Sequence, residues 1–404
     1  MRNLLFLTHR LPFPPNKGDK VRSYNLLRYL AARHRVFLGT FVDDPDDEQH
    51  ISAVRELCAD VHAPRLYPKR ARIGSLRGLV RAEPLTLSYY RNASMTHWVQ
   101  QMLAREPMDA ALVFSSSMAQ YTTSFPGPVL MDFVDVDSAK WTGYASTHRW
   151  PLSWIYGREG RTLLAYEREV AANASRSFFA SEKEAALFRG LAPESANRVE
   201  ALGMGVDAEF FSVDPGRVCP FSANEIPIVF TGAMDYWPNI DAVCWFAREI
   251  LPQLRQRRPS LRFHIVGRAP TAAVRALESE FVTVTGTVPD VRPYLQHAAV
   301  VVVPLRLARG VQSKVLEAMA MARPVVAAAA CVESLNVTPG EHLVSADCAE
   351  DYVQAIDTLL REPSRAIAMG KAGRTRVLGA YSWDAQLRSL DSHLSPSYAP
   401  GLAA

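Results

Sequence analysis

The sequence predicts an α/β protein with two doubly wound domains, each built on a parallel sheet. Apolar runs of strand length alternate with helical patterns along nearly the whole chain, which is typical of parallel sheets covered by helices. At 404 residues the chain is longer than a single hydrophobic core usually supports, so we expect two domains. The composition, 48% hydrophobic and 21% charged, is that of an ordinary globular protein and allows each domain a core of its own.

The same rhythm of elements occurs in both halves of the chain. In the first half, helical patterns cover Val21–Ala32, Glu48–Cys58 and Ser153–Ala172. The expected strands are residues 3–8, 35–42, 111–116, 128–134 and 175–181 in the first half, and residues 226–232, 261–267, 282–286, 298–305, 324–329 and 342–346 in the second.

One segment between the halves lacks any periodicity. Val213–Pro227 is rich in Pro, Gly, Ser and Asn, so we expect it to be a linker. This places an N-terminal domain at residues 1–212 and a C-terminal domain at residues 228–380. A C-terminal helix and flexible tail are expected over residues 381–404.

Charge and cysteine content limit the classes of partner. The net charge of +4 is too mild to indicate nucleic acid as a partner. The five cysteines are scattered without a CxxC pair, which indicates reduced thiols in the cytoplasm and no zinc site.

Prolines and charges soon interrupt the first apolar run, so we expect a first strand and not a signal peptide. No run of residues is apolar enough to span a membrane.

One segment allows peripheral contact with a membrane. Arg65–Arg81 contains six basic residues, no acidic residue, and Leu, Ile and Val between them. Such a basic amphipathic segment can lie on anionic lipid, here at the inner face of the membrane. A solvated loop and helix face would have the same composition, so both interpretations stay open.

The stretch Arg309–Val326 predicts a nucleotide-diphosphate site. It reads as a helix between two apolar runs of strand length, and it carries Lys314 and Glu317 one turn apart. These could form a solvated ion pair worth about 0.2–0.5 kcal/mol. Ligands of parallel sheets, however, bind beyond the carboxyl ends of the strands, where a helix N-terminus favours phosphate. Arg306 and Lys314 would flank that phosphate, and Glu317 could accept hydrogen bonds from a ribose diol.

A second strand-to-helix junction lies in the same domain. In Val229–Phe246 a strand ends at Gly232 and a helix starts near Asn239. Gly232 would let a ligand approach the backbone closely. Both junctions would lie along the carboxyl edge of one sheet, which strengthens an otherwise weak signal.

The first domain has two polar clusters. Directly after the first strand, Thr8–Ala31 crowds together charged and polar residues around Gly18, where a sugar or phosphate could pass close to the backbone; a long exposed loop is the alternative. At the end of a buried strand, three carboxylates are costly unless they are solvated, paired or metal-bound. The members of these clusters are His9, Lys17, Asp19, Lys20 and Arg22 in the first, and Asp132, Asp135 and Asp137 in the second.

Several segments together resemble the retaining family-4 glycosyltransferases of GT-B fold. The segments that carry this resemblance are residues 202–211, 229–246, 265–270, 284–295 and 304–326. His9–Ala31 and Met131–Trp141 are similar, more narrowly, to sugar transferases associated with PEP-CTERM exopolysaccharide systems. The likeness extends over nearly the whole chain.

This resemblance implies a fold and an activity. The fold would be two Rossmann-like domains facing across a cleft. The activity would be transfer of a sugar from a nucleotide-diphosphate-sugar to a glycan or lipid-linked acceptor, with retention, in exopolysaccharide or cell-surface glycan synthesis. The nucleotide-sugar would be a co-substrate, and no cofactor or metal would be required.

The resemblance also implies roles for residues of the second domain. Glu317 would hold the donor ribose, while Arg306 and Lys314 would act catalytically by neutralising the diphosphate. Gly232 would line the phosphate pocket, and Gly310 and Val311 would also bind the donor. Thr287 and Val288 would lie against the base.

Further roles follow for the first domain. Gly18, with Asp19 and His9, would belong to a loop that closes over donor and acceptor. Asp135 and Asp137 would lie near the reacting sugar, with Asp137 among the catalytic residues.

One position departs from the family pattern. A glutamate usual eight positions before Glu317 is Arg309 here, and in relatives that carboxylate contacts the transferred sugar. Two rival hypotheses therefore stay open. One is an inactive GT-B protein that binds a nucleotide-sugar, and the other is a transferase that uses a metal at Asp135 and Asp137, which form a DxD match.

Overall fold

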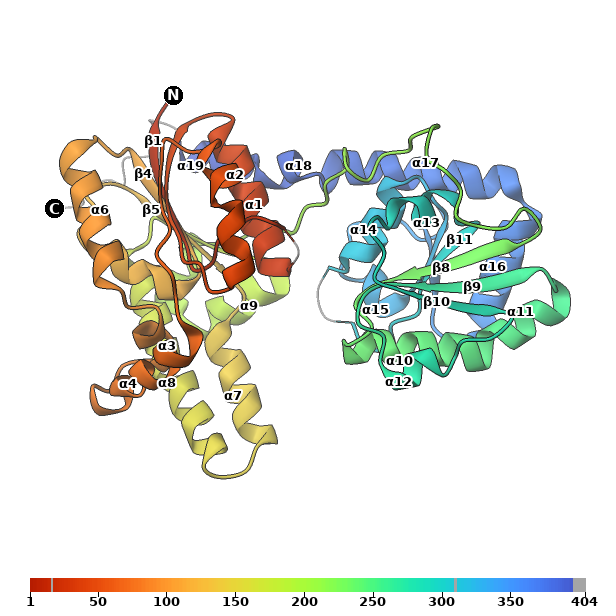
Figure 1. The fold of residues 1–404 in the computed structure, drawn as a ribbon, viewed down its shortest axis with the longest axis horizontal. Coiled ribbons are helices and arrows are strands. Elements are labelled where there is room, and N and C mark those ends of the chain that lie inside the picture. The colour runs from red at the N-terminus through yellow and green to blue at the C-terminus, as the bar shows by residue number, and fades with distance from the viewer. Residues whose placement is uncertain (16, 309–310, 395–404) are drawn as a thin grey trace. The chain divides into compact units, whose positions relative to one another are not determined.

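The computed structural model describes residues 1–15, 17–308 and 311–394, and the chain divides into two compact units (Figure 1). The first unit comprises Met1–Gly203 and the chain from Leu387 onward, and the second comprises Met204–Gln386. Each is a parallel sheet with helices, so the expected fold class of two Rossmann-like α/β domains is confirmed. Within the described ranges, no helix is long and apolar enough to cross a membrane.

The first unit is built on a parallel sheet with the strand order β3-β2-β1-β4-β5-β6-β7. Helix starts are fixed by capping: Asn92 accepts a hydrogen bond from Met95 N before α6, and Ser181 accepts one from Glu184 N before α9. The strands are β1 Asn3–Thr8, β2 Arg35–Gly39, β3 Asp60–His62, β4 Ala110–Phe114, β5 Val129–Val134, β6 Arg176–Phe179 and β7 Val199–Ala201. The helices are α1 Gly18–Ala31, α2 Ile51–Arg55, α3 Pro68–Ser75, α4 Arg77–Val80, α5 Leu85–Tyr89, α6 Ala93–Arg105, α7 Asp137–Thr147, α8 Leu152–Asn173, α9 Glu182–Leu191 and α19 Ser389–His393, with 3₁₀ turns at Pro45–His50, Ser116–Tyr121 and Pro193–Arg198.

The second unit repeats this plan with the order β10-β9-β8-β11-β12-β13. Its strands are continuous β-branched runs because both faces of a parallel sheet are buried; Val300–Val303, which form β11, are entirely inaccessible. The other strands are β8 Ile226–Thr231, β9 Leu261–Val266, β10 Val282–Gly286, β12 Val325–Ala328 and β13 Val344–Ala346. The helices are α10 Trp237–Trp245, α11 Leu251–Arg257, α12 Ala272–Arg275, α13 Arg292–His297, α14 Ser313–Ala320, α15 Ala329–Val332, α16 Ala349–Arg361, α17 Pro363–Ala380 and α18 Trp383–Leu387, with a π-helical turn at Phe246–Ile250.

Strand order determines where each unit can bind a ligand. In the first sheet the order reverses between β1 and β4, and in the second between β8 and β11. Connections leave these two neighbouring strands toward opposite faces, which opens a crevice beyond their carboxyl ends. The segments after β1 and β4, and after β8 and β11, are therefore the candidate site segments.

Buried charge pairs attach α1 to the first sheet. Arg22 and Asp132 are both completely buried, and the guanidinium donates two hydrogen bonds, from Nε at 2.8 Å and from Nη2 at 3.1 Å. Lys20 pairs with Asp47 at 2.6 Å in a similarly buried position. Asp132 is therefore a structural carboxylate at the end of β5. Of the predicted cluster of Asp132, Asp135 and Asp137, Asp132 is therefore buried in the core and is not available to a ligand.

Two predicted boundaries are wrong. The segment predicted as a linker, Val213–Pro227, belongs to the second unit, where Asp214 exchanges two backbone hydrogen bonds with the Gln296 side chain and Phe221 packs on the core. Side chains of other elements hold this irregular segment, so it has no periodicity of its own. Beyond Leu387 the chain returns to the first unit, where Tyr29 donates to Asp391 at 2.8 Å. The rest of the predicted tail, residues 395–404, lies outside the described ranges.

Smaller differences concern short elements. The helix expected from Val21 begins at Gly18, and the helix expected over Glu48–Cys58 is a 3₁₀ turn followed by the short α2. The sequence reading missed β3 and β7. Each has three residues and one buried side chain, Val61 in β3 and Val199 in β7, which is too short a run to produce a periodic signal.

We predict that Asp132→Ala will lower the free energy of unfolding of the first unit by about 3–5 kcal/mol, because it removes the buried carboxylate that compensates the charge of the buried Arg22 guanidinium. Urea unfolding measures this loss. Glu106→Ala is the control, since it removes a carboxylate from the exposed pair with Arg35 and should cost less than about 1 kcal/mol. A loss for Asp132→Ala no larger than the control's would contradict the structural role.

Candidate functional site

The carboxyl ends of β8 and β9 meet at two glycines. The backbone approaches so closely that a Cβ at Gly267 would lie 1.6 Å from the carbonyl oxygen of Gly232. Backbone hydrogen bonds continue past the strands, from Gly232 N to Val266 O at 3.0 Å and from Met234 N to Arg268 O at 2.8 Å. Gly232 therefore lies at the switch point between β8 and β11, as the sequence indicated, and Gly267 is a second required glycine that sequence reasoning left out.

A buried asparagine connects this edge to the α14 helix. Asn239, on α10, donates from Nδ2 to the Ala233 carbonyl at 2.9 Å and accepts from Lys314 Nζ at 3.1 Å. A Cβ at Gly232 would lie 2.8 Å from the same Nδ2. The ammonium of Lys314 is thus fixed beside Gly232 by a partner that the sequence pattern did not single out.

Lys314 and Glu317 are both partly buried on α14. Burial lowers the pKa of Lys314, and the Glu317 carboxylate partly opposes that shift. Burial also raises the pKa of Glu317, opposed by Lys314 and by a hydrogen bond from Ser313. The pair therefore differs from a solvated surface pair, because each group is held in a medium where its charge is costly.

Arg306 lies at the same edge and is more exposed. Its Nε donates to Asp241 Oδ2 at 2.9 Å, and its guanidinium lies 5.6 Å from the centre of the Trp245 ring. Both partners belong to α10, so the segment after β11 is attached to the helix that follows β8. About half of the Arg306 side chain stays accessible to solvent.

Three further residues that were predicted to bind the donor follow β10 or precede α14. Thr287 is exposed just after β10, while Val288 and Val311 are partly buried and pack against the core. Arg309 and Gly310 lie outside the described residues.

In the first unit, His9 and Asp19 come together at the switch point between β1 and β4. His9 follows β1 and stacks on Phe114, the last residue of β4, with centroids 5.7 Å apart. Asp19 Oδ2 lies 3.5 Å from His9 Nε2 and accepts a hydrogen bond from Arg10 at 2.8 Å. Burial alone would raise the pKa of Asp19, but His9 and Arg10 lower it below its usual range. Arg10, which also binds Asp43, was not predicted.

Gly18 begins α1 next to these residues. It is exposed, and among the described residues no atom outside its chain neighbours and its own helix backbone lies within 4 Å of the position that a Cβ would occupy. Packing therefore leaves the space beside Gly18 open to a ligand. Asn16, two positions before Gly18, lies outside the described residues.

Asp135 and Asp137 form a separate group after β5. Both accept hydrogen bonds from Lys140 Nζ, at 2.7 Å and 3.1 Å. Just before them, Val134 has a φ of 71°, a strained value for a β-branched residue and one that is often found at functional sites. One strand, β4, separates β5 from β1, so the structure does not place this group with His9 and Asp19.

Glu167 supports the segment that carries Asp137. It is buried on α8 and accepts hydrogen bonds from the backbone N and the hydroxyl of Ser138, the second residue of α7. Burial raises the pKa of Glu167 to about 8. No group of three or more His, Cys, Asp or Glu side chains is placed to hold a metal ion among the described residues.

Residues 225–362, at the centre of the second unit, match the family model described as "Glycosyl transferases group 1". This segment is therefore similar to a group 1 glycosyltransferase domain. It contains Asn239 and Arg306. It also contains Gly232 and Gly267, which we call the glycine edge, and Lys314 and Glu317 on α14. The sequence matches no curated protein closely enough to count as a relative.

Solved structures share the fold beyond the group 1 domain. HepE of Anabaena in complex with UDP is 15% identical, with a TM-score of 0.67 over 98% of this chain and 99% of that one. Sucrose-phosphate synthase from Thermosynechococcus elongatus is 18% identical, with a TM-score of 0.66 over 97% and 98%. WaaG, a glycosyltransferase involved in lipopolysaccharide biosynthesis, is 16% identical, with a TM-score of 0.59 over 96% and 99%. At these identities the likeness shows the fold alone, with GT-B glycosyltransferases as the structural neighbours.

We predict that Gly267→Ala will destabilise the second unit by about 3 kcal/mol or more, because the new methyl group would overlap the Gly232 carbonyl. Thermal unfolding of the variant measures this. Gly379→Ala is the matched control, since it adds the same methyl group within α17, where no atom lies within 4 Å. Equal stability of the two variants would show that the close approach is not required.

We predict that Glu167 makes stability depend on pH. Its pKa rises from 4.5 to about 8 on folding, so between these values the folded protein keeps a proton that the unfolded chain has released. The free energy of unfolding should therefore fall as pH rises through that window, by at most about 1.4 kcal/mol per pH unit. Urea titrations at several pH values should show a flatter profile for Glu167→Gln. The exposed Glu169→Gln should leave the profile unchanged.

Proposed function

We propose that the protein transfers a sugar from a nucleoside-diphosphate sugar to a glycan or lipid-linked acceptor. The observation that carries this proposal is the position of Lys314 within the group 1 domain. Asn239 holds its ammonium beside the glycine edge at the switch point, near the N-terminus of α14. A cation and a helix N-terminus at that place favour a diphosphate.

The chemistry assigned to the second unit is stabilisation of the leaving diphosphate. Lys314 and Arg306 would neutralise the charge that develops as the sugar leaves, and fixed cations of this kind lower the barrier most in a partly desolvated site. Glu317 would accept hydrogen bonds from the ribose diol, with Gly232 and Val311 beside the phosphates and Thr287 and Val288 beside the base.

The acceptor is assigned to the first unit. His9, Asp19 and the open space at Gly18 would hold acceptor hydroxyl groups at the switch point of that sheet. Asp135 and Asp137 would bind further hydroxyl groups of the sugars. Retention of configuration, a role in exopolysaccharide or cell-surface glycan synthesis, and action at the inner face of the membrane belong to this proposal and are supported by the sequence resemblance.

UDP-sugars are the donors to test first. The fold neighbour HepE has been solved with UDP and with UDP-glucose.

We further propose that the reaction needs no metal, since Arg306, Lys314 and the N-terminus of α14 would neutralise the charge of the diphosphate. Asp135 and Asp137 both bind Lys140, which neutralises part of the charge that a metal would otherwise meet.

Ligand-induced thermal stabilisation tests the donor site. A nucleoside diphosphate at a hundred times its dissociation constant should stabilise the protein by about 2.7 kcal/mol. We expect UDP to do so equally with and without EDTA, and Glu317→Ala and Lys314→Ala to weaken the effect. Glu278→Ala, an exposed carboxylate of the same unit, is the control.

The alternatives predict other outcomes. Stabilisation that requires Mg²⁺ or Mn²⁺ and ignores Glu317 would favour the metal-dependent transferase at Asp135 and Asp137. UDP binding without any consumption of the nucleotide-sugar, across a panel of acceptors, would favour an inactive binding protein.

A further inference from the structure

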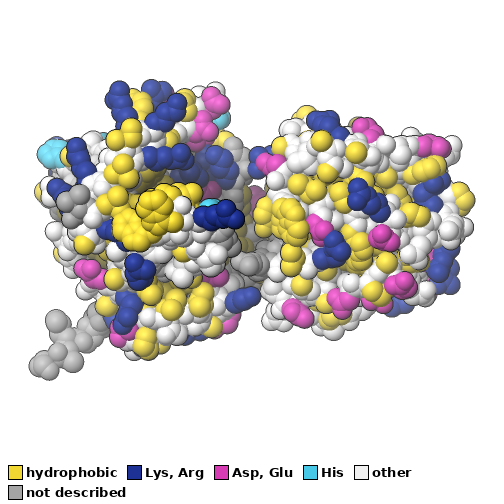
Figure 2. All heavy atoms as spheres, turned by 90° about the horizontal axis from the view of Figure 1, so that it is seen from below, with side chains coloured by type: hydrophobic (Ala, Val, Ile, Leu, Met, Phe, Trp, Pro, Cys, Tyr) yellow, Lys and Arg dark blue, Asp and Glu magenta, His cyan; other side chains and the backbone are white. Residues whose placement is uncertain are grey.

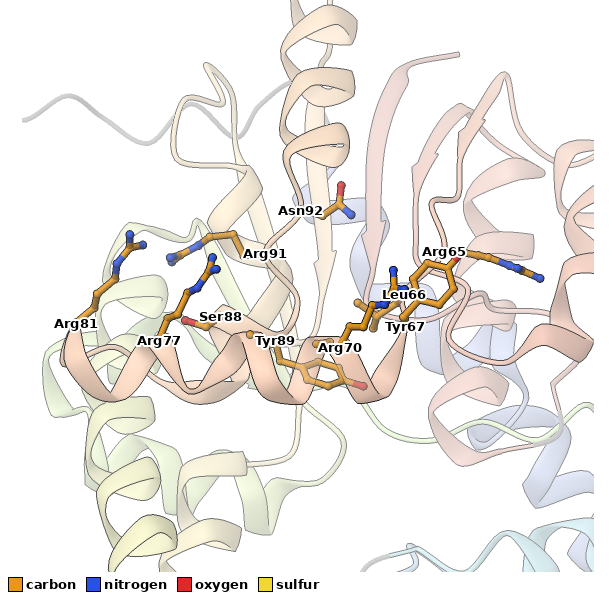
Figure 3. Close-up of a pocket in the computed structure, with 12 residues that line it drawn as sticks. Arg65, Leu66, Tyr67, Arg70, Arg77, Arg81, Ser88, Tyr89, Arg91 and Asn92 are labelled. Atoms are coloured by element: carbon orange, nitrogen blue, oxygen red, sulfur yellow. The ribbon is translucent and has the colours of Figure 1, made fainter.

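A basic pocket opens in the first unit along the basic segment Arg65–Arg81, apart from the candidate site residues described above. It has a volume of about 330 Å³, within the range of about 300–1,000 Å³ usual for small-molecule sites. Its walls come from the start of α3, from α4 and from the end of α5 (Figure 3). The arginines that line it are Arg65, Arg70, Arg77, Arg81 and Arg91.

The positive charge of this arginine pocket is only partly balanced. Arg65 pairs with Glu48 and Arg91 pairs with Glu83. For the other three arginines the structure gives no salt bridge to a described residue, which leaves a surplus of three positive charges. Figure 3 shows the guanidinium groups of Arg77, Arg81 and Arg91 on the same side of the helices. Several guanidinium groups around one cavity favour a phosphate, which they can bind in a bidentate way.

Neutral polar groups complete the lining. Ser88 lines the pocket, and its buried hydroxyl has no hydrogen-bond partner within the described ranges. Asn92 and Tyr89 contribute further polar atoms. The pocket therefore offers neutral donors as well as charge.

Two tyrosine rings connect the pocket to the candidate acceptor residues. Tyr89 forms part of the pocket wall, and its ring contacts that of Tyr90 with centroids 4.8 Å apart. Tyr90 in turn packs edge-on against His9 at 5.7 Å. A molecule with its phosphate in the pocket could thus extend past this pair of rings toward His9.

Exposed apolar side chains lie on the same group of helices. Ile73 on α3 is 71% exposed and Leu76 is 52% exposed. The first half of α8 is attached here, because Arg158 donates to the carbonyl of Gly78 at 2.7 Å. Trp150 and Trp154, at the tip of the α7–α8 hairpin, are 81% and 55% exposed. Figure 2 shows hydrophobic side chains grouped with Lys and Arg on this face of the first unit.

We propose that the arginine pocket binds the phosphate groups of the acceptor, so that the acceptor is a sugar carried on a phosphate or diphosphate. This proposal rests on the proposed function. Guanidinium groups recognise the phosphate, and the neighbouring apolar side chains favour a carrier with a hydrocarbon chain. A soluble sugar phosphate would share the phosphate chemistry but not the apolar contacts.

Direct binding to the full chain tests the pocket. We would measure the affinity for inorganic pyrophosphate and for farnesyl diphosphate by calorimetry, with saturating UDP present so that the donor site is occupied. Arg77→Ala/Arg81→Ala should weaken both affinities by about tenfold or more, the loss typical of a charged hydrogen bond. Arg55→Ala/Arg105→Ala removes the same charge from exposed positions of the same unit and should change neither. Tighter binding of farnesyl diphosphate than of pyrophosphate would indicate a lipid carrier, and equal binding a soluble one.

Other outcomes would overturn the proposal. Unchanged affinities in Arg77→Ala/Arg81→Ala would show that the phosphate binds elsewhere. Arginine-dependent binding to vesicles of phosphatidylcholine and phosphatidylglycerol, without any affinity for pyrophosphate, would show a membrane-docking surface instead. If UDP fails to stabilise the wild-type protein while the pyrophosphate pattern holds without UDP, the proposed function and the acceptor role fail, and the pocket stays a phosphate site.

Discussion

The close backbone approach of Gly232 and Gly267 is the constraint on which the second unit's candidate site depends. At this point a Cβ at Gly267 would overlap the Gly232 carbonyl, and a Cβ at Gly232 would lie 2.8 Å from Asn239 Nδ2, so the observed approach requires glycine at both positions. This leaves room above the sheet for Asn239 to bind both the backbone and Lys314. The position of the Lys314 ammonium therefore depends on glycine at positions 232 and 267.

The first unit reaches a comparable arrangement by burying charge. Arg22 and Asp132 attach α1 to β5 from inside the core, and this attachment places the first turn of α1, with Gly18 and Asp19, beside the end of β1. A buried ion pair contributes little net stability compared with apolar packing, but it penalises other placements of the helix. We therefore infer that the pair of Arg22 and Asp132 fixes the position of α1 on the sheet.

The polar clusters of the first unit divide into two kinds. Asp19, His9 and Arg10 contact one another at the switch point, whereas Asp135 and Asp137 share Lys140 one strand further along. The arginine pocket lies on the other side of Tyr89 and Tyr90 from His9. The two aromatic rings therefore lie between an arginine-rich pocket and a cluster of mixed charge, which suits a ligand with a phosphate at one end and hydroxyl groups at the other.

The sequence by itself determined the longer strands and the plan of two α/β domains, because buried parallel strands such as Val300–Val303 must be continuous apolar runs. It also indicated Gly232, Lys314 and Glu317, since a glycine and charges at strand-to-helix junctions leave a local pattern. Only the tertiary structure decided the strand order, the partners Asn239 and Asp241, and the assignment of 213–227 to the second unit. These depend on contacts between residues far apart in the chain, and such contacts leave no periodicity in the sequence that could reveal them.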